Sequence, residues 1–359
     1  MSSLPTHRDV FRLTNDPNPT PTSPRLRFTT EPLPSTLPAT SVLIKLHAIS
    51  LNYRDANITF GKNPWPVRPD LIPCNDAAGT IIATGLSVTR FAVGDRVAPN
   101  TDMRNLTGRE KERSWLAADE DGVCASYLVL DERVLAHLPS HLSFVEASVL
   151  PCAGVTAWSA LKGVGIGNTI LIQGTGGVAM LAIKLALATG CRVILSSSSD
   201  EKIAGVREKF GDEIVGVNYK SLPEWHEEVL RLTDGAGVDC VVEVGGTASI
   251  VRSLKCTRRG GFVSVVGYLS KDDGLEEMKE LLPLLIDRRI NLRGINAGSV
   301  QDLSDLCAAV TATQMRFDDI IDSARPFEEA EEAIRYVWEG NQVGKVVLTM
   351  ECRGSDHMA

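Results

Sequence analysis

The stretch NTILIQGTGGVAMLAIKLALATG, residues 168–190, decides the fold of this chain. Its apolar run at residues 170–172 predicts a buried parallel strand. From Val178 onwards, apolar residues recur with alanine between them, which predicts a buried helix that ends near Gly190. Between strand and helix lies the glycine turn of residues 174–177. Strand, glycine turn and helix form a dinucleotide-binding unit, in which the glycines permit a tight turn and let backbone N–H groups approach a pyrophosphate.

Length and composition limit the classes of function. At 359 residues, with 43% hydrophobic and 23% charged residues, the chain is expected to form about two domains with proper cores. The net charge of -8 and the pI near 5.4 argue against nucleic acid or an anionic membrane as the main partner. No apolar run approaches the ~18 residues of a membrane helix. Residues 1–13 lack the apolar core of a signal peptide, and the eight cysteines form no CxxC pair, so we expect a cytoplasmic protein with reduced thiols.

The part before the quoted stretch predicts a barrel-like domain of short antiparallel strands. Prolines interrupt residues 1–40, and residues 41–47 nearly alternate between apolar and polar. Further strand-like segments, separated by Gly and Asp turns, lie at residues 72–85, 91–97 and 125–130. Residues 100–122 are polar and irregular, and we expect them to form an exposed loop or lid.

The part around and after the quoted stretch predicts a doubly wound parallel sheet. A helical pattern begins near Ser143. Strands alternating with helices are expected at residues 192–195, 213–217, 238–244, 261–267 and 290–294. Residues 344–348 form a last strand that we expect to return to the first domain.

Eight segments, in order, resemble the medium-chain dehydrogenase/reductase superfamily: LNYRD, PCNDAAG, VGDRV, LPCAGVTAW, GTGGVA, VGG, GINAGS and GKVVL. The resemblance implies an α/β protein with a GroES-like, partly open β-barrel catalytic domain, residues 1–155 completed by 298–359. It also implies a Rossmann NADP-binding domain, residues 156–297, with the active site in the cleft between the two. The family oxidises alcohols, reduces carbonyls, and reduces quinones or activated double bonds with nicotinamide cofactors. Homodimers formed by edge pairing of Rossmann sheets are usual in the family, so a homodimer is a possible assembly here.

The resemblance also bears on zinc. Zinc members place Cys where Asn52 stands, a His-Glu pair where Asn75 and Asp76 stand, and Cys at the position of Cys152. Only Cys152 fits, and catalytic zinc takes three protein ligands. The closely spaced cysteines of a structural zinc lobe are also absent from residues 100–125. We therefore predict no metal and expect Cys152 to be a packed thiol near the nicotinamide.

Without zinc, alcohol oxidation lacks the Lewis acid that lowers the pKa of the alcohol, whereas reduction of an enone or quinone tolerates that loss. Hydrogen-bond donors then stabilise the oxygen on which charge develops. Tyr53 is the candidate donor, with Asn52 orienting substrate or cofactor; alternatively, Tyr53 only packs at the start of a helix. We predict a zinc-independent, NADPH-dependent oxidoreductase that transfers hydride to an activated C=C bond or a quinone. The alternatives are a metal-free alcohol dehydrogenase or carbonyl reductase, and a non-catalytic cofactor-binding protein.

The end of the second parallel strand favours NADPH over NADH. Relatives specific for NAD carry an acidic residue where Ser197 stands, and hydroxyls can donate to a 2′-phosphate that a carboxylate would repel. Lys202 and Tyr219 resemble the pair that grips the 2′-phosphate in NADPH-dependent quinone reductases. Each residue also has a purely structural interpretation: Lys202 as a solvated lysine on a helix, and Tyr219 as an aromatic residue at the end of a strand.

The cofactor-binding residues implied by the resemblance are Thr156, Gly174, Thr175, Gly176, Gly177, Val178, Ser197, Ser198, Lys202, Tyr219, Gly245, Gly267, Ala297, Gly298, Ser299 and Lys345. Lys345 is expected either to reach the phosphates or ribose of the cofactor, or to be a surface lysine. The aromatic residues Phe60, Trp65, Trp115 and Tyr268 suggest a bulky, apolar small-molecule substrate, or else pack in the core.

Overall fold

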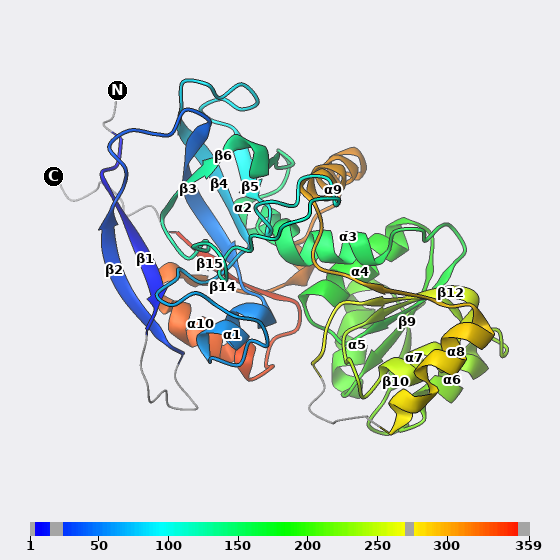
Figure 1. Ribbon diagram of the computed structural model, residues 1–359. Helices are drawn as coiled ribbons and strands as arrows, with labels where there is room; N and C mark the ends of the chain where they lie inside the picture. Colours follow the sequence, from blue (N-terminus) through cyan, green and yellow to red (C-terminus); the bar gives the residue numbers. More distant parts are fainter. Residues whose placement is uncertain (1–3, 15–23, 270–275, 351–359) are drawn as a thin grey trace. The chain divides into compact units, whose positions relative to one another are not determined.

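The computed structural model describes residues 4–14, 24–269 and 276–350. It divides into two compact units (Figure 1). Unit 1 comprises Met1–Val155 and Gly298–Ala359, and unit 2 comprises Thr156–Ala297. One of the eight cysteines, Cys352, lies outside the described residues, and the other seven are free thiols.

Unit 2 contains a six-stranded parallel sheet in the order β10-β9-β8-β11-β12-β13. Its strands are β8 (Thr169–Gln173), β9 (Arg192–Ser197), β10 (Val215–Asn218), β11 (Val238–Glu243), β12 (Thr257–Val265) and β13 (Asn291–Gly294). This order confirms the predicted doubly wound sheet. The direction of strand order reverses between β8 and β11, which is where such sheets bind dinucleotides.

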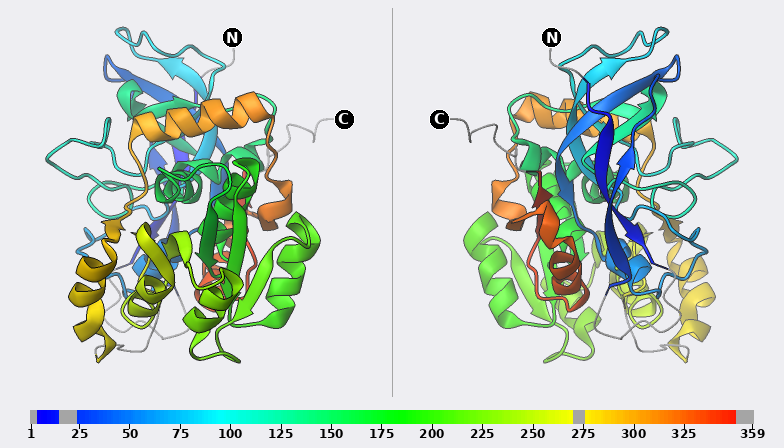
Figure 2. Two further views of the ribbon diagram at one scale, coloured as in Figure 1. Left: turned by 90° about the vertical axis from the view of Figure 1, so that its right-hand side faces the viewer. Right: turned by 90° about the vertical axis from the view of Figure 1, so that its left-hand side faces the viewer.

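Helices lie on both faces of this sheet (Figure 2). They are α3 (Val155–Ala160), α4 (Gly177–Ala188), α5 (Asp200–Phe210), α6 (Trp225–Leu232), α7 (Ile250–Cys256) and α8 (Leu281–Arg288). The quoted stretch forms β8 and α4, and both are largely buried because their sequences are almost entirely apolar. The strand and helix predicted there are confirmed.

Unit 1 is built on a seven-stranded sheet in the order β14-β15-β3-β4-β5-β7, with β6 also paired to β3. Its strands are β3 (Ser41–Ser50), β4 (Ala77–Thr84), β5 (Arg96–Pro99), β6 (Tyr127–Asp131), β7 (Leu135–His137), β14 (Ile321–Pro326) and β15 (Lys345–Thr349). A separate antiparallel pair consists of β1 (His7–Leu13) and β2 (Leu26–Pro32). β15 pairs antiparallel with β3, so the last strand does return to the first domain.

The helices of unit 1 are α1 (Tyr53–Thr59), α2 (Phe144–Ala147), α9 (Val300–Thr313) and α10 (Ala330–Trp338), with a π-helical turn at Leu150–Gly154. α1 and α10 lie side by side (Figure 1). No helix of the described residues is long and apolar enough to cross a membrane.

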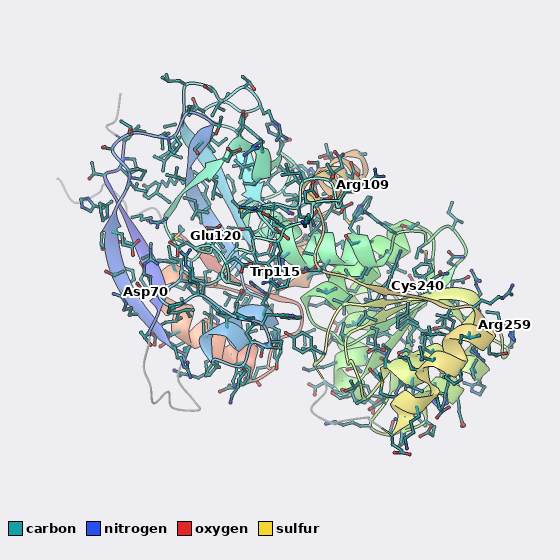
Figure 3. All side chains as sticks on the ribbon, viewed as in Figure 1. Asp70, Arg109, Trp115, Glu120, Cys240 and Arg259 are labelled. Atoms are coloured by element: carbon teal, nitrogen blue, oxygen red, sulfur yellow. The ribbon has the colours of Figure 1, made fainter. Side chains whose placement is uncertain are left out.

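The expectation that residues 100–122 form an exposed loop is wrong for half of the segment. Trp115 and Leu116 are only 7% and 1% exposed. Leu116 belongs to the core cluster of unit 1, and the Trp115 ring packs edge-on against Trp65. The buried carboxylate of Asp102 accepts a hydrogen bond from Ser114 N at 2.9 Å and so joins the two ends of the exposed part between them. Apart from Glu120, its exposed residues lie within 104–113; Trp115 and Arg109, labelled in Figure 3, mark its buried and exposed parts.

Candidate functional site

A polar cluster in unit 1 gathers at the start of α1. Asn52 N donates a hydrogen bond to the Asp55 carboxylate at 2.8 Å, which fixes the residue that precedes the helix. The Asn52 side-chain amide then donates to Asn75 Oδ1 and to Asp76 Oδ2, each at 3.2 Å. Its own Oδ1 accepts from Lys345 Nζ at 2.6 Å. All hydrogen-bonding groups of the Asn52 side chain are therefore used within the cluster.

The centre of this cluster is a buried ion pair. Lys345 Nζ lies 3.2 Å from Asp76 Oδ2, and the two residues are 2% and 0% exposed. The other oxygen, Asp76 Oδ1, accepts from Cys152 N at 2.8 Å. Burial raises the pKa of Asp76, and the ammonium of Lys345 opposes that rise. Lys345 is thus not a surface lysine: it neutralises a carboxylate that would be costly to bury alone.

A second buried carboxyl, Asp55, lies beside this pair. It is 0% exposed, and burial raises its pKa to about 6. Its Oδ1 has no hydrogen-bond partner among the residues that the structure describes. Asp55 therefore changes charge near neutral pH, within a group whose other charges are paired.

These residues do not fit a catalytic zinc ion. Zinc needs deprotonated Cys, neutral His or free carboxylate ligands, but Asn52 and Asn75 offer amides and the Asp76 carboxylate is held by Lys345. Burial raises the pKa of the Cys152 thiol to about 12, and its sulfur is 3.8 Å from the Asn75 amide nitrogen. Over residues 4–14, 24–269 and 276–350, no group of three or more His, Cys, Asp and Glu could hold a metal ion.

Tyr53, the predicted donor, is the first residue of α1. Its ring stacks on Trp338 of α10 with centroids 5.9 Å apart and planes 11° apart. The side chain is half-buried, and burial raises its pKa, so the phenol stays protonated. Tyr53 therefore packs at the start of a helix, as the alternative interpretation of this residue held, and its hydroxyl also keeps a proton that it can donate.

In unit 2, the glycine turn forms a cradle for a phosphate. Gly174 has φ +80°, a conformation that favours glycine. Gly176 precedes α4, no side chain caps this helix end, and a Cβ at Gly176 would meet no atom within 4 Å. The first N–H groups of this twelve-residue helix, next to Thr175, Gly177 and Val178, thus have no side-chain cap, and the space at Gly176 is open. These residues fit the pyrophosphate of a dinucleotide.

The residues predicted to select NADPH also lie together. Ser197 ends β9 and pairs with Asn218 of β10, and Tyr219 N donates to Ser197 O at 3.0 Å. Lys202 lies in the first turn of α5, where its N–H donates to Ser199 Oγ. The structure thus brings Ser197, Lys202 and Tyr219 to the carboxyl ends of two neighbouring strands, and Ser198 follows Ser197 directly.

The remaining predicted cofactor residues are divided between the units. Gly245 and Gly267 follow β11 and β12, and a Cβ at Gly267 would lie 2.7 Å from Val244 O. Unit 2 also contains Thr156, in α3, and Ala297, with φ +49°.

Gly298, Ser299 and Lys345 belong to unit 1. There Gly298 O accepts from Asn100 Nδ2 at 3.2 Å, and Ser299 caps α9.

Of the residues proposed to surround an apolar substrate, Phe60 and Trp115 are buried, at 7% exposure each. They pack in the core of unit 1, as the alternative interpretation held. Trp65 and Tyr268 are 41% and 43% exposed.

Sequence reasoning missed two buried groups in unit 2, Glu243 and Gln173, whose side chains hydrogen-bond to each other at 2.8 Å. The signal was a glutamate that ends the apolar run of residues 240–242, two residues before a pair of glycines.

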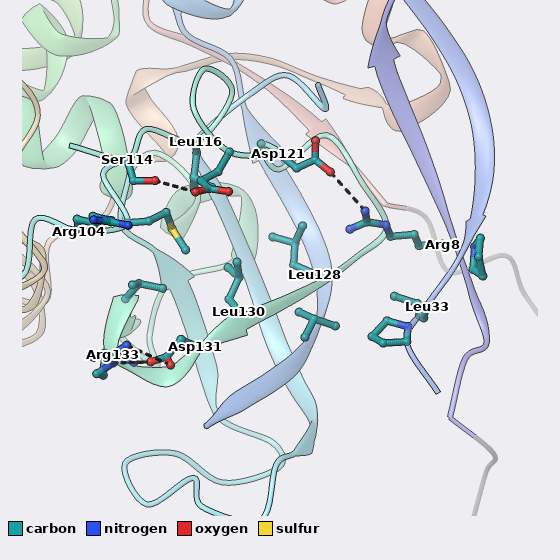
Figure 4. Close-up of a pocket in the computed structure, with 17 residues that line it drawn as sticks. Arg8, Leu33, Arg104, Ser114, Leu116, Asp121, Leu128, Leu130, Asp131 and Arg133 are labelled. Atoms are coloured by element: carbon teal, nitrogen blue, oxygen red, sulfur yellow. Dashed lines mark hydrogen bonds and ion pairs between the residues drawn. The ribbon is translucent and has the colours of Figure 1, made fainter. Parts of the chain in front are cut away.

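A cavity of about 520 Å³ lies elsewhere in unit 1, beside β6 and residues 103–122 (Figure 4). Two ion pairs lie among its lining residues, with Arg133 Nε 2.9 Å from Asp131 Oδ1 and Arg8 3.8 Å from Asp121. None of the predicted site residues lines it.

Comparisons with known proteins agree with this arrangement. Residues 38–140 match the alcohol dehydrogenase GroES-like domain, and residues 177–312 match the zinc-binding dehydrogenase family. The chain is 36% identical to a zinc-type alcohol dehydrogenase-like protein of Schizosaccharomyces pombe over 89% of this chain and 93% of that one. It is 28% identical to an alcohol dehydrogenase of Geobacillus stearothermophilus, over 86% and 92%.

A crystal structure of an NAD-dependent alcohol dehydrogenase matches with a TM-score of 0.82 and 28% identity, over 96% of this chain and all of that one. The matches extend over nearly the whole chain, and the two family models cover parts of both units. The chain is therefore an oxidoreductase of the medium-chain dehydrogenase/reductase superfamily, which uses a nicotinamide cofactor.

Proposed function

We propose that this chain is a zinc-independent, NADPH-dependent reductase that transfers hydride to an activated C=C bond or a quinone. The observation that carries the proposal is the cluster of Asn52, Asp76 and Lys345. Where zinc relatives hold a metal, the cluster presents amides, a buried thiol and a carboxylate already neutralised by an ammonium group.

A metal-free site favours acceptors that need little activation. When bound, reduced nicotinamide supplies the hydride. Tyr53 supplies a proton from its hydroxyl, which burial keeps protonated, to the oxygen or carbon on which negative charge develops. Because its amide is fully engaged with Asp76 and Lys345, Asn52 acts by holding the start of α1 and hence Tyr53, rather than by contacting substrate.

NADPH is the cofactor that we propose. Ser197 offers a hydroxyl where an NAD enzyme needs a carboxylate, and the neighbouring Lys202 adds a positive charge for the 2′-phosphate. The pyrophosphate would bind at Gly176 and the first turn of α4. In unit 2, the backbone at Gly245, Gly267 and Ala297 would hold the nicotinamide end.

A second candidate is a metal-free alcohol dehydrogenase or carbonyl reductase. It is favoured by the names of the relatives, several of which are alcohol dehydrogenases. It would use the same hydride donor and the same Tyr53 proton, with a carbonyl as the acceptor.

We also propose that the chain forms a homodimer through the edge of the unit 2 sheet. β13 is the edge strand, and Leu292 in it is 36% exposed. On helix α8, which contacts the neighbouring strand β12, Leu282 and Ile286 are 65% and 78% exposed. An exposed edge strand beside apolar side chains is a surface that proteins usually cover.

The test is oxidation of NADPH and NADH, side by side, with quinones, enones, aldehydes and ketones as acceptors, with and without a chelator. Chelator-insensitive turnover of NADPH with enones or quinones supports the first proposal. Turnover confined to carbonyl acceptors supports the second. Activity that a chelator removes and zinc restores refutes the metal-free assignment, and cofactor binding without any turnover indicates a non-catalytic protein.

A further inference from the structure

An isolated negative charge is buried at the carboxyl end of β11. Glu243 is the last residue of that strand and is 0% exposed. Its Oε1 accepts from Gly245 N at 2.8 Å and from Gly246 N at 3.1 Å. Its Oε2 accepts from Gln173 Nε2 at 2.8 Å. The carboxylate therefore holds the turn that follows its own strand.

Every partner of this carboxylate is a hydrogen-bond donor. The hydroxyls of Ser249 and Ser253 also bond to it, and Ser253 Oγ itself accepts from Gln173, so its proton is directed at Glu243. The Gln173 amide is oriented by its Oε1, which accepts from Val244 N at 3.1 Å. Each of the five side-chain hydrogen bonds to Glu243, from Gly245, Gly246, Gln173, Ser249 and Ser253, is donated to its carboxylate.

Among the residues that the structure describes, no ion pair joins a Lys, Arg or His side chain to Glu243. The buried carboxylate of Asp76 in unit 1, by contrast, forms an ion pair with Lys345. The negative charge of Glu243 is dispersed over dipoles alone, so its field reaches the neighbouring strand ends.

The strand order places Glu243 on the nicotinamide half of the sheet. A dinucleotide crosses such a sheet between β8 and β11, and the residue that reads the adenosine ribose lies at the end of β9. The adenosine half therefore belongs to β8, β9 and β10, and the nicotinamide half to β11, β12 and β13. Glu243 ends the strand of the second half that is nearest to the crossing point.

We propose that Glu243 sets the preference of the site for the oxidised over the reduced cofactor. The nicotinamide ring is cationic when oxidised and neutral when reduced, so a buried anion stabilises the oxidised form selectively. Tighter binding of the oxidised form makes the bound reduced cofactor a stronger hydride donor, which suits a reductase. This inference rests on the proposed cofactor binding, but it is independent of which substrate is reduced.

The test is direct titration of NADP+ and NADPH into wild-type protein and Glu243→Gln, by calorimetry without any substrate. In the variant we expect the affinity for NADP+ to fall about 10-fold relative to that for NADPH. An equal change for both forms would overturn the inference, because a purely structural role weakens both. Ser249→Ala is the matched control: it removes one hydrogen bond, keeps the charge, and should leave the affinity ratio unchanged.

A second variant decides the matter if Glu243→Gln does not fold, as judged by circular dichroism. Gln173→Lys leaves Glu243 in place and puts a cation beside it, so the affinity ratio should move in the same direction. An unchanged ratio in this variant would also refute the inference. If the wild type binds NAD+ and NADH instead, the ratio is measured with that pair and only the proposed choice of NADPH fails. Failure to bind any nicotinamide nucleotide refutes both proposals.

Discussion

Replacement of Lys345 by methionine should destabilise unit 1 strongly. Lys345 is the only cation paired with Asp76 among the described residues, and both side chains are buried. Methionine fills a similar volume but leaves the carboxylate with only the hydrogen bonds from Asn52 and Cys152. Removal of one partner of a buried ion pair costs about 3–5 kcal/mol, and we expect that loss at pH 8.

The loss should depend on pH in a defined direction. Burial already raises the pKa of Asp76, and the variant raises it further because the opposing charge of Lys345 is gone. A carboxyl whose pKa is higher in the folded than in the unfolded state costs stability as the pH rises through the folded pKa. At a pH above the folded pKa, each tenfold weakening of the acid in the folded protein costs about 1.4 kcal/mol. The deficit should therefore be small near pH 4 and reach its full size by pH 8.

The assay is urea unfolding of the full chain at pH 5 and pH 8, followed by tryptophan fluorescence. Lys62→Met, at an exposed position of the same unit, is the matched control and should behave as the wild type. The double variant Lys345→Met/Asp76→Asn removes both charges and should recover most of the loss. A single variant within about 1 kcal/mol of the wild type at pH 8, or a deficit that does not change with pH, would refute this account of the cluster.

Three further predictions concern separate parts of the molecule. Tyr53→Phe should lower kcat by about 100-fold or more. The urea midpoint should stay near that of the wild type, since the aromatic ring is retained. An unchanged kcat would mean that the Tyr53 ring only packs. Ser197→Asp should raise the KM for NADPH by about 10-fold and the KM for NADH by much less, because a carboxylate repels the 2′-phosphate. The measurement is steady-state kinetics with both cofactors, and an equal change in the two KM values would contradict this prediction. Burial raises the pKa of Glu146, but hydrogen bonds led by those from Arg316 outweigh burial and lower this pKa to about 2. The stability that ionised Glu146 contributes is therefore present above pH 4.5 and is lost as the pH falls through 2. Glu146→Gln should therefore lose about 2–3 kcal/mol at pH 7 and approach the wild type in acid, which urea unfolding across pH would check.

The fold could be predicted where the sequence carries a strong local pattern. β8 and α4 were predicted correctly because an uninterrupted apolar run and a glycine turn leave few alternatives. Residues 100–122 were mispredicted because their charged residues outnumber Trp115 and Leu116, which nevertheless anchor the segment in the core. Local composition does not reveal which few residues of a polar stretch reach the interior.

The site could be predicted only in part. Asn52 and Asp76 stood out because they replace metal ligands, yet the partner that explains them, Lys345, is 269 residues away from Asp76. Their contact arises because β15 pairs with β3, and no local pattern encodes that pairing. Glu243 was missed for a related reason: its hydrogen bond to Gln173 joins two strands that are separated by 70 residues.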